Sequence, residues 1–141
     1  NSGVLLLVLQ TPVVNASITN NTVNGTQTAD GFVFRVDDPG ATVTINLFNN
    51  IASGGDRRGY TVSNSGGASI TLVADQNDSY GNADPDDFAG LPTGTVLHTL
   101  PQFVNASAGD LRLLPTSPLI NSGVNAPSGG TSTLDAAFRS T

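Results

Sequence analysis

Ile-Thr-Asn-Asn-Thr-Val-Asn-Gly, at positions 18–25, returns as Leu-Phe-Asn-Asn-Ile-Ala-Ser-Gly at positions 47–54, so the Asn pair moves on by a step of 29. A degraded third copy, Val-Ala-Asp-Gln-Asn-Asp-Ser-Tyr-Gly, occupies positions 73–81, and the next step is 28 if Asn77 corresponds to Asn49. Repeats of this length are typical of stacked supersecondary units, each burying its apolar face against the next. The repeat therefore decides the fold.

A second pair of matching segments supports the same period. Gly-Phe-Val-Phe at positions 31–34 matches Gly-Tyr-Thr-Val at positions 59–62, a step of 28, and short apolar stretches alternate with Gly, Asn and Asp turns up to about residue 81. A repeat of about 28 residues holding two or three strands fits one coil of a parallel β-solenoid, with coils one strand spacing apart, about 4.8 Å. The sequence predicts three or four such coils.

Composition agrees with an all-β chain. All 11 acidic residues are Asp and all five basic residues are Arg, while Met, Trp and Cys are absent. Residues that favour helices are therefore scarce, whereas turn and strand formers dominate. The net charge of −6 argues against nucleic acid as a partner. The apolar run at residues 4–9 is too short to span a membrane, which needs about 20 residues, and is expected to be a buried strand.

The recurring Asn residues predict a ladder of side-chain amides. An Asn at the same place in consecutive coils can bond the amide above and the amide below it. Even steps of 28 select Asn21, Asn49 and Asn77 as the rungs. The alternative is that Asn-rich turns recur by chance in an Asn-rich chain.

The C-terminal region resembles a known family. Residues 101–104 read Pro-Gln-Phe-Val, residues 109–113 Gly-Asp-Leu-Arg-Leu, residues 115–123 Pro-Thr-Ser-Pro-Leu-Ile-Asn-Ser-Gly, and residues 134–139 Leu-Asp-Ala-Ala-Phe-Arg. This pattern is similar to the closing segment of bacterial right-handed parallel β-helix surface proteins, the pectin-lyase-like proteins of the choice-of-anchor Q type. Asn121 stands where the family usually has Asp.

The resemblance implies a right-handed parallel β-helix. Residues 1–100 would form its coils, with an irregular acidic loop at about 82–100, and residues 101–141 an irregular C-terminal cap of the same domain. Residue 1 is not expected to be a natural start, so further coils or a partner would cover that end. The expected core is Leu5, Leu7, Val14, Ile18, Phe32, Phe34, Val43, Ile45, Phe48, Ile51, Val62, Ile70 and Leu72.

Two kinds of polar site are candidates. Asp84, Asp86 and Asp87 place three carboxylates within four positions, and such oxygen ligands suit calcium; the alternative is a solvated turn in which Asp side chains cap backbone amides. No other cofactor is implied. Five Asn-x-Ser/Thr sequons occur, and Asn24 and Asn105 are the most plausible glycosylation sites because both fall on turns.

Arginines near acidic residues are the nearest approach to an active site. Asp56, Arg57 and Arg58 are expected to lie near Asp30 in the coil below and Asp84 in the coil above. An Arg beside a substrate carboxylate or a pair of Asp residues could serve polysaccharide chemistry. The alternative is that the two Arg side chains neutralise stacked Asp residues. His98, the single His, is expected to be a surface or packed residue.

The expected function is structural or adhesive. We expect an extracellular or cell-surface module that associates with itself or with the remainder of a longer chain, with no catalytic residues assigned and carbohydrate as a candidate ligand. The alternative is a polysaccharide-active β-helix, lyase-like or glycosidase-like, whose catalytic residues lie mostly outside this segment. An enzyme would show a groove with clustered Asp, Arg or aromatic side chains on one sheet.

Overall fold

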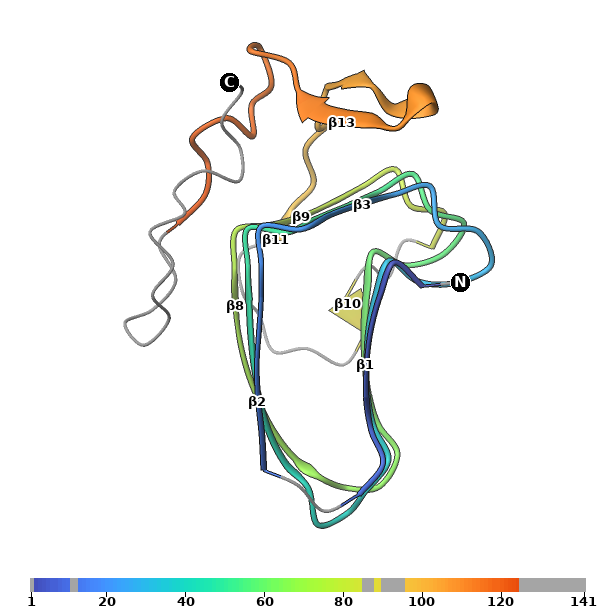
Figure 1. The fold of residues 1–141 in the computed structure, drawn as a ribbon, viewed down its shortest axis with the longest axis vertical. Helices are drawn as coiled ribbons and strands as arrows, with labels where there is room; N and C mark the ends of the chain where they lie inside the picture. Colours follow the sequence, from blue (N-terminus) through green and yellow to red (C-terminus); the bar gives the residue numbers. More distant parts are fainter. Residues whose placement is uncertain (1, 11–12, 85–87, 90–95, 125–141) are drawn as a thin grey trace.

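The computed structural model is built almost entirely from β-strands. It describes residues 2–10, 13–84, 88–89 and 96–124, with backbone alone for 88–89 (Figure 1). The 3₁₀ helix η1 (Ala106–Ala108) lies in the C-terminal part, and no helix in the described ranges is long and apolar enough to cross a membrane. The strands are β1 (Val4–Val8), β2 (Val13–Thr19), β3 (Thr22–Asn24), β4 (Phe32–Val36), β5 (Thr42–Phe48), β6 (Ile51–Ser53), β7 (Tyr60–Asn64), β8 (Ser69–Asp75), β9 (Asn77–Tyr80), β10 (Phe88–Ala89), β11 (Val96–Leu97), β12 (Phe103–Asn105) and β13 (Asp110–Leu113).

Three parallel sheets contain the strands up to β11. Sheet A has the order β1-β4-β7-β10, sheet B β2-β5-β8 and sheet C β11-β9-β6-β3. The chain visits sheets A, B and C in that order three times. We call β1-β2-β3, β4-β5-β6 and β7-β8-β9 the first, second and third circuits, and the nine strands together the stack. Seen along the stack, the circuits superpose, with sheet B on the left, sheet A on the right and sheet C across the top (Figure 1).

Each strand pairs in parallel with the strand one circuit later. In sheet A, Val4 pairs with Phe32 and Phe32 with Tyr60, so the register advances in two even steps of 28. In sheets B and C the first step is 29 and the second is 27. The inequality arises because the connection from sheet A to sheet B is longer by one residue in the second circuit (positions 37–41) than in the third (positions 65–68). The chain is thus an all-β structure of stacked parallel sheets, as its composition predicts.

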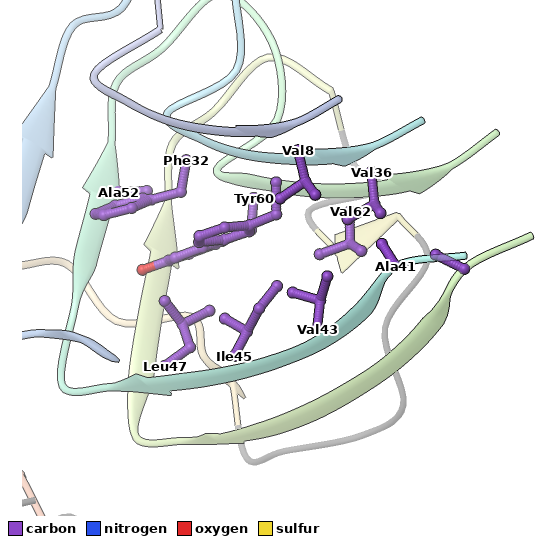
Figure 2. Packing of buried hydrophobic residues seen from close by; sticks show 12 residues of the cluster. Val8, Phe32, Val36, Ala41, Val43, Ile45, Leu47, Ala52, Tyr60 and Val62 are labelled. Carbon is purple, nitrogen blue, oxygen red and sulfur yellow. The ribbon is translucent and has the colours of Figure 1, made fainter. Parts of the chain in front are cut away.

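One apolar core fills the space between the three sheets. Alternate side chains of each strand point inward, as the strand period of two requires. The rings of Phe32 and Tyr60 stack with centroids 4.8 Å apart, and Val43, Ile45 and Leu47 of β5 face them from sheet B (Figure 2). The Tyr60 hydroxyl donates to the backbone carbonyls of Asn50 and Asp78, which satisfies its polar end within the core.

Strand β1 buries the face opposite to the one that the sequence predicted. Leu6 and Val8 pair with inward-facing residues of β4 and pack against the core. The Leu5 and Leu7 side chains point outward and are 60% and 45% exposed, so their assignment to the core was wrong. The physical reason is that a continuous apolar run has no alternation, and only its pairing partner decides which face is buried.

The other expected core residues are buried or packed against the core, with two differences of place. Phe48 is buried but belongs to neither apolar cluster, because it follows the inward-facing Leu47 on β5. Ile51 is buried on the outer face of sheet C, where it belongs to a second, smaller cluster with Leu113 and Leu119. We call residues 103–124 the C-terminal segment. Its hairpin, β12 and β13, pairs antiparallel, and Figure 1 shows it above sheet C, beside the stack rather than within its outline. The described part of the expected cap therefore packs on the side of the stack through sheet C.

Candidate functional site

A ladder of asparagine amides runs along the corner between sheets B and C. Nδ2 of Asn21 donates to Oδ1 of Asn50 over 3.1 Å, and Nδ2 of Asn50 donates to Oδ1 of Asn77 over 2.9 Å. The same two acceptor oxygens also take the backbone N–H groups of Asn21 and Asn50. Asn50 and Asn77 are almost completely buried, so these bonds satisfy amides that would otherwise be costly to bury. The ladder joins all three circuits.

The middle rung of the ladder is Asn50 and not the predicted Asn49. Asn49 has a φ of +56°, and the residues at the same corner of the other circuits, Asn20 and Gln76, share this left-handed conformation. Its side chain pairs instead with the backbone of Val124, with Nδ2 to O at 2.7 Å and Oδ1 to N at 2.9 Å. Even steps of 28 select Asn49, whereas the real steps of 29 and 27 select Asn50.

Two arginines in the connection between the second and third circuits bind acidic residues at the corner between sheets C and A. Arg57 Nε lies 3.2 Å from Asp30 Oδ1, and Arg58 Nε lies 3.3 Å from Asp84 Oδ2. Asp30 is 8% exposed and also accepts bonds from the backbone N–H of Arg58 and the hydroxyl of Thr61. The expected neighbours, Asp30 below and Asp84 above, are confirmed. Asp30 is an internal crosslink, because three donors converge on its carboxylate.

The candidate calcium site extends beyond the described residues. Asp86 and Asp87 lie outside them, and the described member, Asp84, forms an ion pair with Arg58. Within the described ranges, no group of three or more metal-ligating side chains gathers at one place. Calcium binding at Asp84, Asp86 and Asp87 stays a prediction.

The two candidate glycosylation residues differ in accessibility. Oδ1 of Asn24 accepts a hydrogen bond from the Ser53 hydroxyl, and the residue is half-buried at the end of β3. Asn105 is exposed, and its side chain caps η1 by accepting from the backbone N–H of Ala108. Asn105 is therefore the more accessible acceptor, although its amide oxygen already holds the local turn.

Asn82 is a structural residue that the sequence reasoning missed. Oδ1 of Asn82 accepts from the backbone N–H of Gly55, and Nδ2 donates to the Ala52 carbonyl and to the Ser79 hydroxyl. These bonds join the end of sheet C in the third circuit to the second circuit. Its signal in the sequence is its place immediately after Gly81, which ends the third copy of the repeat.

The single histidine lies beside β9 of sheet C. His98, expected to be a surface or packed residue, is exposed. Its Nδ1 lies 3.1 Å from the Ser79 carbonyl oxygen. The residue therefore has a structural contact at the surface of the stack.

Two half-buried carboxyls have shifted pKa values. A hydrogen bond from the Ser65 hydroxyl, assisted by Arg35, lowers the pKa of Asp37 in the connection between sheets A and B. The hydrogen bond from Arg112 lowers the pKa of Asp110 in β13. Both carboxyls are ionised at neutral pH. The Asp37 carboxyl joins two circuits, whereas the Asp110 carboxyl binds a residue of its own strand.

Comparison of the chain with protein-family models, curated proteins and solved structures finds no match. The functional argument therefore depends on the sequence and on the geometry of the described residues.

Proposed function

We propose that this chain is a structural or adhesive module of the cell surface or extracellular space. In this proposal the stacked circuits are coils of a right-handed parallel β-helix, and the module associates with a second copy of itself or with further coils of a longer chain. The resemblance of residues 101–123 to the closing segment of choice-of-anchor Q proteins supports this assignment. The amide ladder and the Asp30 crosslink support it too, because both use polar side chains to join circuits.

The observation that carries the proposal is the outer side of the first circuit. Strands β1, β2 and β3 are each the last strand of their sheet on the same side of the stack. Their backbone hydrogen bonds to described strands run to the second circuit, which leaves a row of donors and acceptors on the other side. Such strand edges favour pairing with another chain unless charges, bulges or proline protect them.

Apolar side chains gather at this same side. Leu5, Leu7, Leu9 and Val13 are between 45% and 77% exposed. In the next two circuits of sheet A, the outward positions beside Leu5 are Val33 and Thr61, and those beside Leu7 are Arg35 and Ser63, so three of these four are polar. A cavity of about 490 Å³, lined by Val23 and glycines among others, also opens beside β3. Exposed apolar surface concentrated at strands that pair along one edge is typical of an interaction face.

The polysaccharide-active alternative stays a prediction. Its best residues, the Arg57 and Arg58 corner, hold carboxylates of the chain itself in ion pairs. No described observation favours it over the structural role.

Sedimentation velocity of the whole chain over a range of concentrations tests the proposal. We expect the unmodified chain to associate with increasing concentration, and the double variant Leu5→Lys, Leu7→Lys to shift to monomer, because lysines protect strand edges from pairing. Both leucine side chains are largely exposed, so the isolated fold should tolerate the change. The matched control is Thr42→Lys, Thr71→Lys, which adds the same charge on the outer face of sheet B.

A chain that stays monomeric at every concentration would contradict self-association. The remaining alternative is that further coils of a longer chain pair with the first circuit. It predicts that the backbone amide hydrogens of β1 exchange freely with solvent in the monomer. Association that the control variant weakens as much as the β1 variant would show a nonspecific charge effect and would contradict the assigned face.

A further inference from the structure

A groove lies between the ends of sheet C and the chain that enters the C-terminal segment. It has a volume of about 370 Å³. On one side are Asn24, Ser53 and Tyr80, which pair with one another as the last residues of β3, β6 and β9. The opposite side is formed by residues 100–103 and Ala106. Its volume falls in the range of small-ligand sites, roughly 300–1,000 Å³.

The side chains of this groove offer apolar surface without charge. Every lining residue belongs to the described part of the chain, and none is charged, although the chain carries a net charge of −6. The Tyr80 side chain is 37% exposed and Leu100 is 52% exposed, which is unusual for large apolar groups next to a buried cluster. Gly54 and Gly81 have no side chains and positive φ values, so they leave the base of the groove open.

Residues on both sides of the groove carry hydrogen-bond donors that the fold does not use. The Asn24 side chain accepts from Ser53 through Oδ1, and the Gln102 side chain accepts from Thr116 through Oε1. Within the described ranges the amide nitrogens of both side chains, and the Tyr80 hydroxyl, make no hydrogen bond to the protein. Each amide is held in place by its oxygen and keeps its N–H groups for another partner.

We propose that this groove binds a neutral saccharide. A sugar ring combines apolar C–H faces, which pack on an aromatic ring, with hydroxyl oxygens that accept from amide N–H groups. The groove offers both features and lacks the positive charge that would select an acidic sugar or a phosphate. The site shares Asn24 with β3 of the first circuit, but its other lining residues lie outside that circuit, so saccharide binding does not require association between copies.

The residues have separate roles in this site. Tyr80 provides the stacking surface from the third circuit, while Asn24 from the first circuit and Gln102 from the chain leaving sheet C provide the donors. Because Asn24, Ser53 and Tyr80 come from three circuits, the groove runs across the strands of sheet C. A ligand lying along it would contact each circuit in turn, which favours a short oligosaccharide over a single sugar.

Titration of the ¹⁵N-labelled whole chain, followed by NMR, tests this proposal. The probes are cellohexaose and mannohexaose as neutral saccharides, hexagalacturonate as an acidic one, and a proline-rich peptide as a competing class. We expect saturable shifts of the Gly54, Gly81 and Ala106 amide signals with at least one neutral saccharide and weaker binding of hexagalacturonate. Tyr80→Ala should weaken binding about tenfold, because it removes the aromatic contact.

Two further variants keep the test independent of folding. Tyr80→Phe retains the ring and should keep most of the affinity, whereas Ala106→Glu places a charged side chain at the exposed edge of the groove and should abolish binding without removing a packed group. Val73→Ala, on sheet B, is the matched control. Failure of both neutral saccharides to bind, binding unchanged by Tyr80→Ala and Ala106→Glu, or binding of the peptide alone would each overturn the proposal. Sedimentation measures association between copies, whereas this titration measures saccharide binding in the groove. Failure of one proposal is therefore distinguishable from failure of the other.

Discussion

The stack and the C-terminal segment are held together in different ways. In the stack, each interior strand pairs with a neighbour on both sides, and twelve buried residues form one cluster between three sheets. The C-terminal segment pairs its two strands with each other and meets the stack mainly through a cluster of three buried residues, one of them supplied by sheet C. Repeated pairing spreads stability over many equivalent contacts, whereas the segment depends on a few.

This difference predicts that damage to the stack is global and damage to the segment is local. Stacked units are stabilised by their nearest neighbours, so removing an interior contact weakens every circuit that depends on it. A segment attached through a small apolar contact can open alone, at a free energy below that of global unfolding. The predictions below test this contrast, from the largest expected effect to the smallest.

Phe34→Ala should have the largest effect. The Phe34 side chain is fully buried in the second circuit, and removing a buried aromatic ring costs about 3–5 kcal/mol. We expect a loss of this size in the free energy of unfolding, measured by urea denaturation. Val33→Ala, at a half-buried outward position of the same strand, is the control and should cost much less. Equal losses for the two variants would contradict the assigned inward face of β4.

Asn50→Ala should have the second largest effect on the free energy of unfolding, and Asn49→Ala should lower that free energy by less. Replacing Asn50 leaves the exposed Asn21 and the buried Asn77 without their common neighbour, and an unsatisfied buried polar group, as at Asn77, costs about 1–3 kcal/mol. Among the described residues the Asn49 side chain bonds only the backbone of Val124, so its loss should release that contact and leave the ladder intact. Urea denaturation of the two single variants measures the difference. A larger loss for Asn49→Ala would contradict the ladder.

The ladder also shows what sequence reasoning could and could not supply. The period, the pairing of Phe32 with Tyr60 and the proximity of Arg57 and Arg58 to their acidic neighbours all follow from counting positions between similar segments. Counting failed where the circuits differ in length, because both Asn49 and Asn50 are asparagines and only the longer connection at positions 37–41 distinguishes them.

Burial on β1 and the place of the C-terminal segment could not be predicted either. Residues 4–9 are apolar throughout, so no alternation tells the inward Leu6 from the outward Leu5. Ile51 is apolar and was assigned to the core between the sheets, but it faces outward and is covered by Leu113 and Leu119. Contacts between a repeat and a segment outside the repeat have no period, and only the three-dimensional structure shows them.

Leu119→Ala should destabilise the C-terminal segment and leave the stack nearly unchanged. Leu119 is 1% exposed, and a buried leucine truncated to alanine costs at least about 2 kcal/mol where the site cannot collapse. Hydrogen exchange measures the effect by residue. We expect faster exchange at Leu114, whose amide bonds the Gln102 carbonyl, and unchanged exchange at Ile45 in β5. Faster exchange at both positions would show that the segment and the stack unfold together.

The carboxyls of Asp37 and Asp110 should have the smallest effect on stability, and they again compare the stack with the C-terminal segment. Asp37 is bonded by Ser65 of the next circuit, whereas Asp110 is bonded by Arg112 of its own strand. The pKa of each is lowered in the folded chain, by the Ser65 hydrogen bond at Asp37 and by the Arg112 hydrogen bond at Asp110. A carboxyl with a lowered folded-state pKa stabilises the fold above its unfolded pKa, and this contribution is lost as the pH falls through the folded-state value.

Acid titration distinguishes the contributions of Asp37 and Asp110. Between pH 7 and a pH below about 4, the ordinary range for Asp, we expect Asp37→Asn to reduce the acid-induced fall in the melting temperature, because the wild-type carboxylate joins two circuits of the stack. Asp110→Asn should leave that fall almost unchanged, because its bond to Arg112 lies within one strand and holds nothing to the stack. NMR titration of the two carboxyl groups checks that both pKa values lie below the ordinary value in the folded chain. If Asp110→Asn altered the acid response as much as Asp37→Asn, the hairpin would be coupled to the circuits, and the separation between stack and segment would be wrong.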